Sequence, residues 1–131
     1  MLRVAKRRVS GEVNPIPLGD VTHLLFSDES FDVVTSIFTL EILDQGELVR
    51  TLREVLRVLR GDGEFLTISI HDRPCRSIKL YKLLSKLSPT IFNCKPIKPD
   101  KLLNQAGFWI IRKHETRLYK LPIIIAVASE G

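Results

Sequence analysis

The chain has 131 residues and a mass of 14.9 kDa, which suits one domain and excludes two full domains. Hydrophobic residues make up 44% of it, charged residues 27%, and the mean hydropathy is +0.07, which excludes a disordered or fibrous protein. Its longest uncharged apolar run, residues 121–128, is far shorter than the roughly 18–20 residues of a membrane-spanning helix. Residues 1–8 are basic and no apolar segment follows them, which argues against a secretory signal and predicts a cytoplasmic protein.

The cysteine spacing and the distribution of charged residues limit the classes of site and partner. Cys75 and Cys94 are the only cysteines and have no Cys or His partner at metal-ligand spacing, so we expect neither a disulfide framework nor a metal. Residues 1–72 carry eight Lys and Arg against twelve Asp and Glu, whereas residues 73–131 carry twelve against three. This asymmetry indicates an anionic partner (nucleic acid, phosphorylated metabolite or membrane surface) or, more commonly, a solvated basic face.

The first expected elements are a helix and two strands. Residues 2–9 have the pattern of the last turns of an amphipathic helix. Residues 13–18 predict a short edge strand, because Pro15 and Pro17 cannot donate ladder hydrogen bonds. The apolar, β-branched run 31–38 predicts a strand that is buried on both faces in a parallel sheet.

A helix follows that strand. Asp44 and Glu47 form the pattern of a capping box, and the apolar side chains after them recur at spacings of three and four residues. We expect residues 61–63, Gly-Asp-Gly, to end the helix and lead into a second buried strand over 64–70. Strand, helix and strand in this order predict a βαβ unit with a right-handed crossover.

The last third predicts two helices and a hairpin. Residues 74–87 have an apolar stripe and a basic stripe at helical spacing, and residues 100–105 form a short helix that ends at Gly107. Residues 108–117 and 121–128 are close enough to pair as an antiparallel hairpin.

Several short motifs occur in a fixed order along the chain. They are Gly19-Asp20, Leu24-Leu-Phe26, Ser30-Phe-Asp-Val-Val34, Leu52-Arg-Glu-Val-Leu-Arg-Val-Leu-Arg60, Gly61-Asp-Gly63 with a following strand, and Ala106-Gly-Phe108 before the hairpin. In this order they resemble the C-terminal two-thirds of the class I S-adenosylmethionine (SAM) dependent methyltransferases, in the branch that includes ubiquinone and menaquinone C-methyltransferases.

The resemblance implies an α/β, Rossmann-like fold with a mostly parallel sheet, a C-terminal antiparallel hairpin and the family strand order 3-2-1-4-5-7-6. Residues 1–131 would be one domain without the first two strands and the Gly-rich SAM turn, and residues 72–98 would be an insertion that covers the substrate. The strand over 31–38 would then have a long unpaired edge, which can recruit another chain. An internal start codon, a truncated gene, or completion by a partner chain or a second copy would each explain the absent part.

The resemblance also implies cofactor contacts. Asp20 matches the acid that accepts a hydrogen bond from the adenine amino group, with the N–H of Val21 facing the ring, although a loop aspartate that caps nearby N–H groups is the alternative. Ser36, Ile37 and Phe38 lie at the carboxyl end of a central strand, where open α/β sheets bind ligands.

Three further residues are expected on the substrate side of the site. Glu41 follows the strand over 31–38 and either faces the substrate or is a plain surface glutamate. His71 and Asp72 follow the next strand and could contact substrate or act as a base, whereas most histidines at a strand end are structural.

Two functions remain open from the sequence. The first is SAM-dependent methyl transfer to a small molecule, anionic if the basic stripe faces it, with catalysis chiefly by proximity and orientation. The second is a non-catalytic subunit that pairs through its exposed strand edge, as a homodimer or with a partner chain. Nucleic acid is a weaker candidate, because the basic stripe has no interleaved aromatic residues beyond Tyr81.

Overall fold

A computed structural model describes residues 19–72, 78–79, 83 and 96–131 of the chain. The expected helix over 2–9 and the expected strand over 13–18 lie outside the described residues. So does most of the expected helix over 74–87, and with it most of the predicted insertion.

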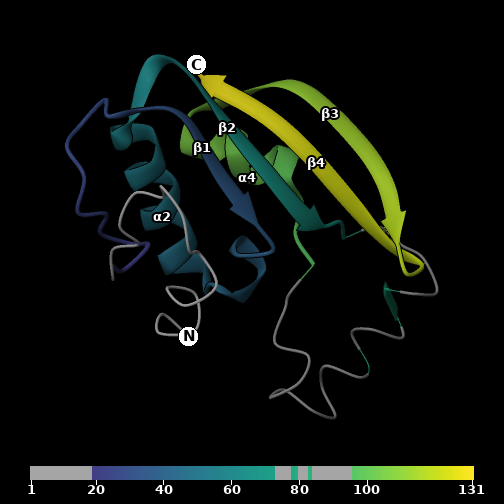
Figure 1. Cartoon of the computed structure of the whole chain (residues 1–131). Coiled ribbons are helices and arrows are strands. Elements are labelled where there is room, and N and C mark those ends of the chain that lie inside the picture. Colours follow the sequence, from purple (N-terminus) through teal and green to yellow (C-terminus); the bar gives the residue numbers. More distant parts are fainter. Residues whose placement is uncertain (1–18, 73–77, 80–82, 84–95) are drawn as a thin grey trace, which may run out of the picture.

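The described strands form one sheet in the order β1-β2-β4-β3 (Figure 1). The strands are β1 (Phe31–Ile37), β2 (Leu59–Ile70), β3 (Phe108–Leu118) and β4 (Leu121–Glu130). β1 pairs with β2 in parallel, whereas β4 is antiparallel to both β2 and β3. This order equals the 4-5-7-6 part of the expected strand order, so the α/β fold is confirmed. Within the described strands the sheet is mixed rather than mostly parallel, because the hairpin adds two antiparallel pairs.

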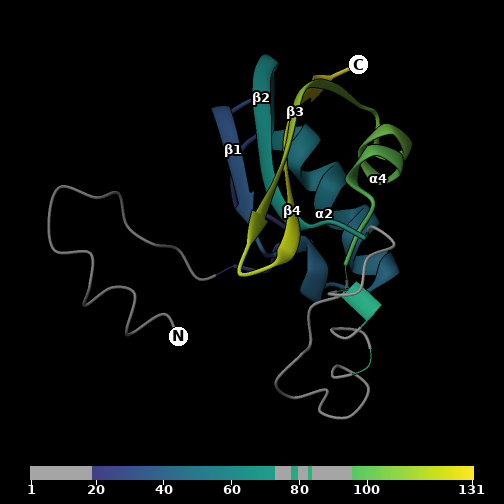
Figure 2. The same cartoon turned by 90° about the vertical axis from the view of Figure 1, so that its right-hand side faces the viewer.

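Two helices and a short 3-10 helix accompany the sheet, namely α2 (Gln45–Val58), α4 (Pro99–Ala106) and η1 (Leu40–Ile42). α2 and α4 both lie against the same face of the sheet (Figure 2). The expected capping box begins α2, since Asp44 Oδ1 accepts from the N–H of Glu47 at 2.8 Å and Glu47 Oε2 accepts from the N–H of Asp44 at 2.9 Å. No helix in the described ranges is long and apolar enough to cross a membrane.

The C-terminal ends of α2 and α4 differ in the residue that ends the helix. Residues 61–63 do not end α2 as expected, because the helix stops at Val58 and Leu59 is already extended (φ −80°, ψ 139°). Residues 61–63 lie within β2, where the pairing with β1 shifts register. α4 does end at a glycine, and Gly107 adopts the left-handed conformation (φ 97°) that side chains with a Cβ disfavour.

The hydrophobic core lies between the sheet and the two helices. Its largest side chains are Phe65 of β2 and Phe108 of β3, whose ring centroids are 5.3 Å apart. Around them are Leu40, Leu48, Leu52, Val55, Leu59, Leu103, Ala126 and Ala128. The apolar stripe of α2 is therefore buried as the sequence predicts.

The opposite face of the sheet, which we call the open face, has no described helix over most of its area. β1 presents Val33 (54% exposed) and Ile37 (56% exposed) there, and β3 presents Trp109 (71% exposed). The prediction that β1 is buried on both faces is therefore wrong. The reason is that the described helices α2 and α4 cover one face only, and β1 has a described neighbour only on its β2 side.

Candidate functional site

The chain turns sharply where β1 ends. Phe38 has a positive φ of 50°, in the left-handed region that is strained for a residue with a Cβ. Its N–H still donates to the carbonyl of Ile68 on β2 at 2.9 Å, so the strained residue is fixed to the sheet. Strained backbone clusters at ligand sites, and the carboxyl edge of an open α/β sheet is where ligands bind.

Glu41 lies on η1 directly after this turn and is fully buried. Its Oε1 accepts a hydrogen bond from the N–H of Ile70, at the end of β2, at 2.6 Å. Burial raises the pKa of Glu41, and the hydrogen bond from the N–H of Ile70 offsets this only in part. The alternative that Glu41 is a plain surface glutamate is therefore wrong, and the expectation that it faces the substrate stays a prediction.

Buried polar atoms without a hydrogen-bond partner gather at the same edge. Across the described residues there are four such side-chain atoms, and three are Ser36 Oγ, Glu41 Oε2 and His71 Nδ1. The fourth is Thr51 Oγ1 on α2. Buried polar groups are almost always hydrogen-bonded, and each exception calls for an explanation such as a ligand. The structure thus places three of the sequence-predicted residues at the ends of β1 and β2 with unused hydrogen-bonding capacity.

His71 and Asp72 continue from β2 into this edge. The side chain of His71 is 13% exposed, and its Nδ1 is 3.7 Å from Oε1 of Glu115 on β3. That separation is an ion-pair distance for a protonated histidine and too long for a hydrogen bond. The N–H of Asp72 donates to the carbonyl of Ile97 at 2.9 Å, which fixes the segment before α4 against the end of β2. Glu115 was not predicted from the sequence, because it is one of many charged residues on an exposed strand.

Asp20 and Val21 lie in a separate turn. Asp20 Oδ1 accepts hydrogen bonds from both the N–H and the hydroxyl of Thr22 at 2.8 Å. The backbone bond, followed by the hydroxyl bond, holds the pKa of Asp20 below its usual range, so the exposed carboxylate is ionised at neutral pH. One carboxylate oxygen of Asp20, Oδ1, therefore caps nearby donors as the alternative predicts. The other oxygen remains able to accept a hydrogen bond.

The loop after this turn is fastened to α2 by Arg57. Its guanidinium donates to the carbonyls of Phe26 and Leu24, each at 2.9 Å, and to Asp28 Oδ1 at 2.6 Å. The same group donates to both carboxylate oxygens of Glu54, at 3.0 and 2.8 Å. All five N–H donors of Arg57 are thereby used, which fixes the loop relative to the helix.

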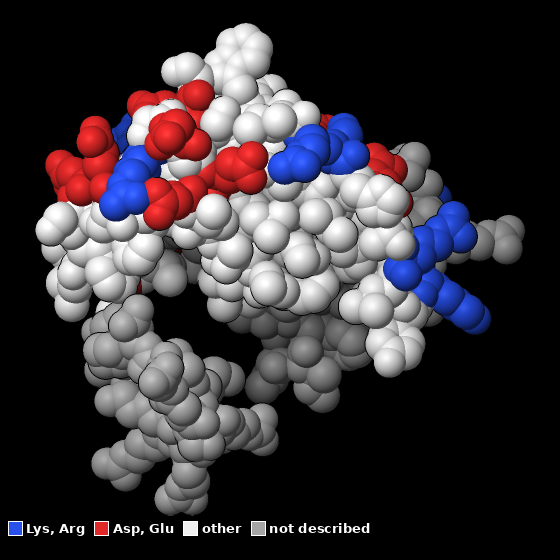
Figure 3. All heavy atoms as spheres, turned by 45° about the horizontal axis from the view of Figure 1, so that its top comes forward, with Lys and Arg blue, Asp and Glu red and all other residues white. Residues whose placement is uncertain are grey.

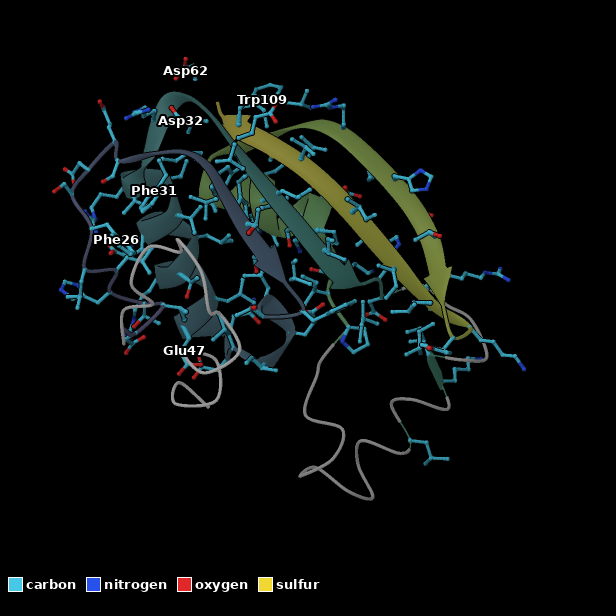
Figure 4. The ribbon with its side chains drawn as sticks, in the orientation of Figure 1. Phe26, Phe31, Asp32, Glu47, Asp62 and Trp109 are labelled. Atoms are coloured by element: carbon cyan, nitrogen blue, oxygen red, sulfur yellow. The ribbon has the colours of Figure 1, made fainter. Side chains whose placement is uncertain are left out.

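Two further contacts fix the same loop. Phe26 packs edge-on against Phe31 at the start of β1, with ring centroids 4.9 Å apart (Figure 4). The N–H of Leu24 donates to Glu54 Oε2 at 2.8 Å. The hydrogen bonds from Arg57, and then that from Leu24, lower the pKa of Glu54 to about 2. The ion pair between Glu54 and Arg57 was not predicted from the sequence, where both residues were noted only as part of the motif over residues 52–60.

A cavity of about 560 Å³ borders the carboxyl edge on the helix side of the sheet. Segment 40–48, with η1 and the start of α2, lines one part of it, and segment 96–105, with α4, lines the other. Glu41 belongs to the lining, together with Lys98 and Lys101. In the described part of the chain, no three His, Cys, Asp or Glu side chains gather as a metal site would require.

The chain is similar to known proteins in sequence family and in fold. Residues 1–67 match the methyltransferase domain family, so the chain belongs to this family. No curated protein shows significant similarity to the chain over its sequence.

Solved structures share the fold at low sequence identity. A SAM-dependent methyltransferase from Methanosarcina mazei is 18% identical with a TM-score of 0.79, over 98% of this chain and 76% of that one. A putative methyltransferase from Bacillus halodurans is 15% identical with a TM-score of 0.76, over 98% and 78%. A chain from the complex between the Haloferax volcanii Trm112 methyltransferase activator and a putative methyltransferase is 14% identical with a TM-score of 0.77, over 100% and 68%.

Proposed function

We propose that this protein is a SAM-dependent methyltransferase that acts on a small molecule. The observation that carries the proposal is the group of three unpartnered buried polar atoms, on Ser36, Glu41 and His71, at the carboxyl edge of the sheet. Membership in the methyltransferase domain family supports it, as does the fold shared with a protein named as SAM-dependent. On the motifs in the sequence, we place the chain in the ubiquinone and menaquinone C-methyltransferase branch. The cytoplasmic location expected from residues 1–8 is part of the same proposal.

The residues present fit the cofactor. The exposed Asp20 carboxylate is ionised and retains a free acceptor oxygen for an adenine amino group, and Val21 follows it in the turn. Ser36 Oγ offers a buried hydroxyl without a partner, and Ile37 and Phe38 complete the end of β1. When bound, SAM supplies an electrophilic methyl group on a sulfonium.

The contribution of the chain itself is positioning. Arg57 and Glu54 hold the loop after Asp20 against α2, so the adenine contact does not have to be ordered during binding. Glu41 and His71 place polar atoms on the substrate side, where they orient a nucleophile by hydrogen bonds. Asp72 lies beside His71 at the same strand end and completes the proposed substrate contacts.

Calorimetric titration of the 131-residue chain with SAM tests this proposal. We expect saturable micromolar binding, and about tenfold weaker binding by Asp20→Asn, since a charge-assisted hydrogen bond is lost. Asp62→Asn removes a carboxylate of β2 at the opposite end of the sheet and serves as the matched control. Absence of SAM binding by the folded chain contradicts the proposal.

A second candidate function is pairing through β1, with a second copy or a partner chain. The observation that favours it is the apolar, exposed side of a strand with a described neighbour on one side only. Figure 3 shows a broad uncharged area on one face of the molecule, with acidic and basic side chains along its upper and right-hand edges. Sedimentation velocity tests this candidate: a concentration-dependent dimer that Val33→Lys abolishes supports it, and a monomer at all concentrations contradicts it.

A further inference from the structure

The cavity beside Glu41 contains three kinds of surface. Its apolar part is formed by Leu40, Leu43, Leu48, Ile97 and Leu102, with Pro96 beside them, and the exposed amides of Gln45 and Gln105 also belong to the lining. Its volume of about 560 Å³ lies within the range of about 300–1,000 Å³ that is usual for small-molecule sites. An apolar body of about the size of one aromatic ring with a short side chain can therefore occupy it.

One buried side-chain acceptor, the carboxyl group of Glu41, belongs to the lining. Glu41 is fully buried, and its Oε1 is already bonded to the N–H of Ile70. Its Oε2 has no partner in the described structure. A buried carboxyl oxygen left without a donor is costly, so a ligand that brings an O–H or N–H group to it gains a hydrogen bond without displacing one.

Two lysines supply the third kind of surface. Lys98 and Lys101 line the cavity from segment 96–105, and both are exposed. Among the described residues neither forms an ion pair, whereas Lys113, which also faces α4, is bonded to Asp100 at 3.0 Å. Two unneutralised cations on the rim of this cavity favour an anionic group at that position.

From these three parts we infer that the cavity binds a small amphipathic acid, with its anionic group at Lys98 and Lys101, its apolar body on the aliphatic lining and a hydrogen-bond donor at Glu41. The inference rests on the proposed function in one respect, since it makes this acid the class of methyl acceptor. Binding itself requires no cofactor, because every group named belongs to the chain.

Calorimetry of the full chain without SAM tests the inference with three matched probes. They are 4-hydroxyphenylacetate, phenylacetate, which lacks the donor, and 4-methylphenol, which lacks the anion. We expect 4-hydroxyphenylacetate to bind about fivefold to tenfold more tightly than either analogue, because each analogue loses one polar contact. Equal affinities for the three probes, or no saturable binding of any, would overturn the inference.

Substitutions on the lysines provide the second measurement. Lys98→Gln combined with Lys101→Gln is expected to weaken both acids about fivefold or more and to leave 4-methylphenol unchanged. Lys120→Gln, in the turn between β3 and β4 and outside the cavity lining, is the matched control with unchanged affinities. Unchanged acid binding in the double variant would overturn the placement of the anion.

The SAM titration separates this inference from the proposed function. Probe binding without SAM binding keeps the acid site and contradicts the methyltransferase proposal. SAM binding without probe binding keeps the methyltransferase proposal and overturns the acid site.

Discussion

The two faces of the sheet have similar residues and different surroundings. On the helix face, Phe65 and Ile124 are completely buried, and Phe65 belongs to the core between the sheet and the two helices. On the open face, Val33 and Ile37 of β1 remain more than half exposed. The difference lies in the coverage of each face and not in strand composition, because both sets of side chains are aliphatic or aromatic.

The helix face of the sheet accounts for stability, whereas the open face is suited to association. Free energy of folding comes mainly from apolar area removed from water, and in the described structure the helix face supplies most of that area. An exposed apolar face contributes little to stability and is a typical site of association. Substitutions on the two faces should therefore change different measurements.

The largest expected loss of stability comes from removing a buried side chain on the helix face. Phe65→Ala removes a fully buried ring that packs against Phe108, and we expect it to lower the free energy of unfolding by about 3–5 kcal/mol. Urea denaturation followed by circular dichroism measures this loss. A decrease below about 1 kcal/mol would show that the helix face is not the main source of stability.

A smaller effect is expected from the charges that fasten the loop to α2. The pKa of Glu54 is lowered from 4.5 to about 2, so its ion pair with Arg57 stabilises the protein fully above pH 4.5 and is lost as the pH falls toward 2. Glu54→Gln should therefore be less stable at pH 7 and should lose less stability between pH 4.5 and 2. Thermal unfolding over this pH range is the measurement, with the exposed Glu130→Gln as control. Parallel curves for Glu54→Gln and the unchanged chain would contradict the assignment.

The hairpin turn offers a change that touches neither face. Tyr119 and Lys120 both have positive φ, 47° and 69°, as the two-residue turn of a twisted hairpin requires. Lys120→Gly relieves the strain of a Cβ at that position and should raise the free energy of unfolding by about 0.5–1 kcal/mol. Lys113→Gly, within β3, is the opposite control and should destabilise the protein. A loss of stability by Lys120→Gly would contradict the turn geometry.

The smallest effect on stability is expected on the open face. Ile37→Thr keeps a β-branched residue at an exposed position, and we expect a change below about 0.5 kcal/mol in the free energy of unfolding. If the chain self-associates, the same variant should shift sedimentation toward the monomer. A large loss of stability would show that something covers Ile37 in solution.

Most of the described fold could be predicted from residue periodicity and end signals. The capping box at Asp44, the apolar stripe of α2 and the hairpin all follow local rules that one segment can satisfy alone. The end of α2 was predicted at the glycines of 61–63 and lies at Val58, because pairing of Leu59 with Phe31 begins the strand earlier. The exposure of β1 could not be predicted, since a run such as 31–38 carries no information about which helices cover it.

The candidate site was predictable only in part. The positions of Ser36, Glu41 and His71 at strand ends follow from the βαβ pattern, which brings the ends of parallel strands to one edge. Their unpartnered atoms, the contact of His71 with Glu115, and the cavity between 40–48 and 96–105 depend on segments far apart in sequence. Long-range packing of this kind leaves no short-range signal.

The position of β4 has a consequence for how the chain is made. β4 is the last strand in sequence, yet it lies inside the sheet, between β2 and β3, and contributes Ile124, Ala126 and Ala128 to the buried face. During synthesis, β1, α2 and β2 leave the ribosome well before β4, the sheet neighbour of β2, has been made. The sheet therefore closes only after residues 121–130 have emerged, and until then the edge of β2 is open to chaperones or to a neighbouring nascent chain.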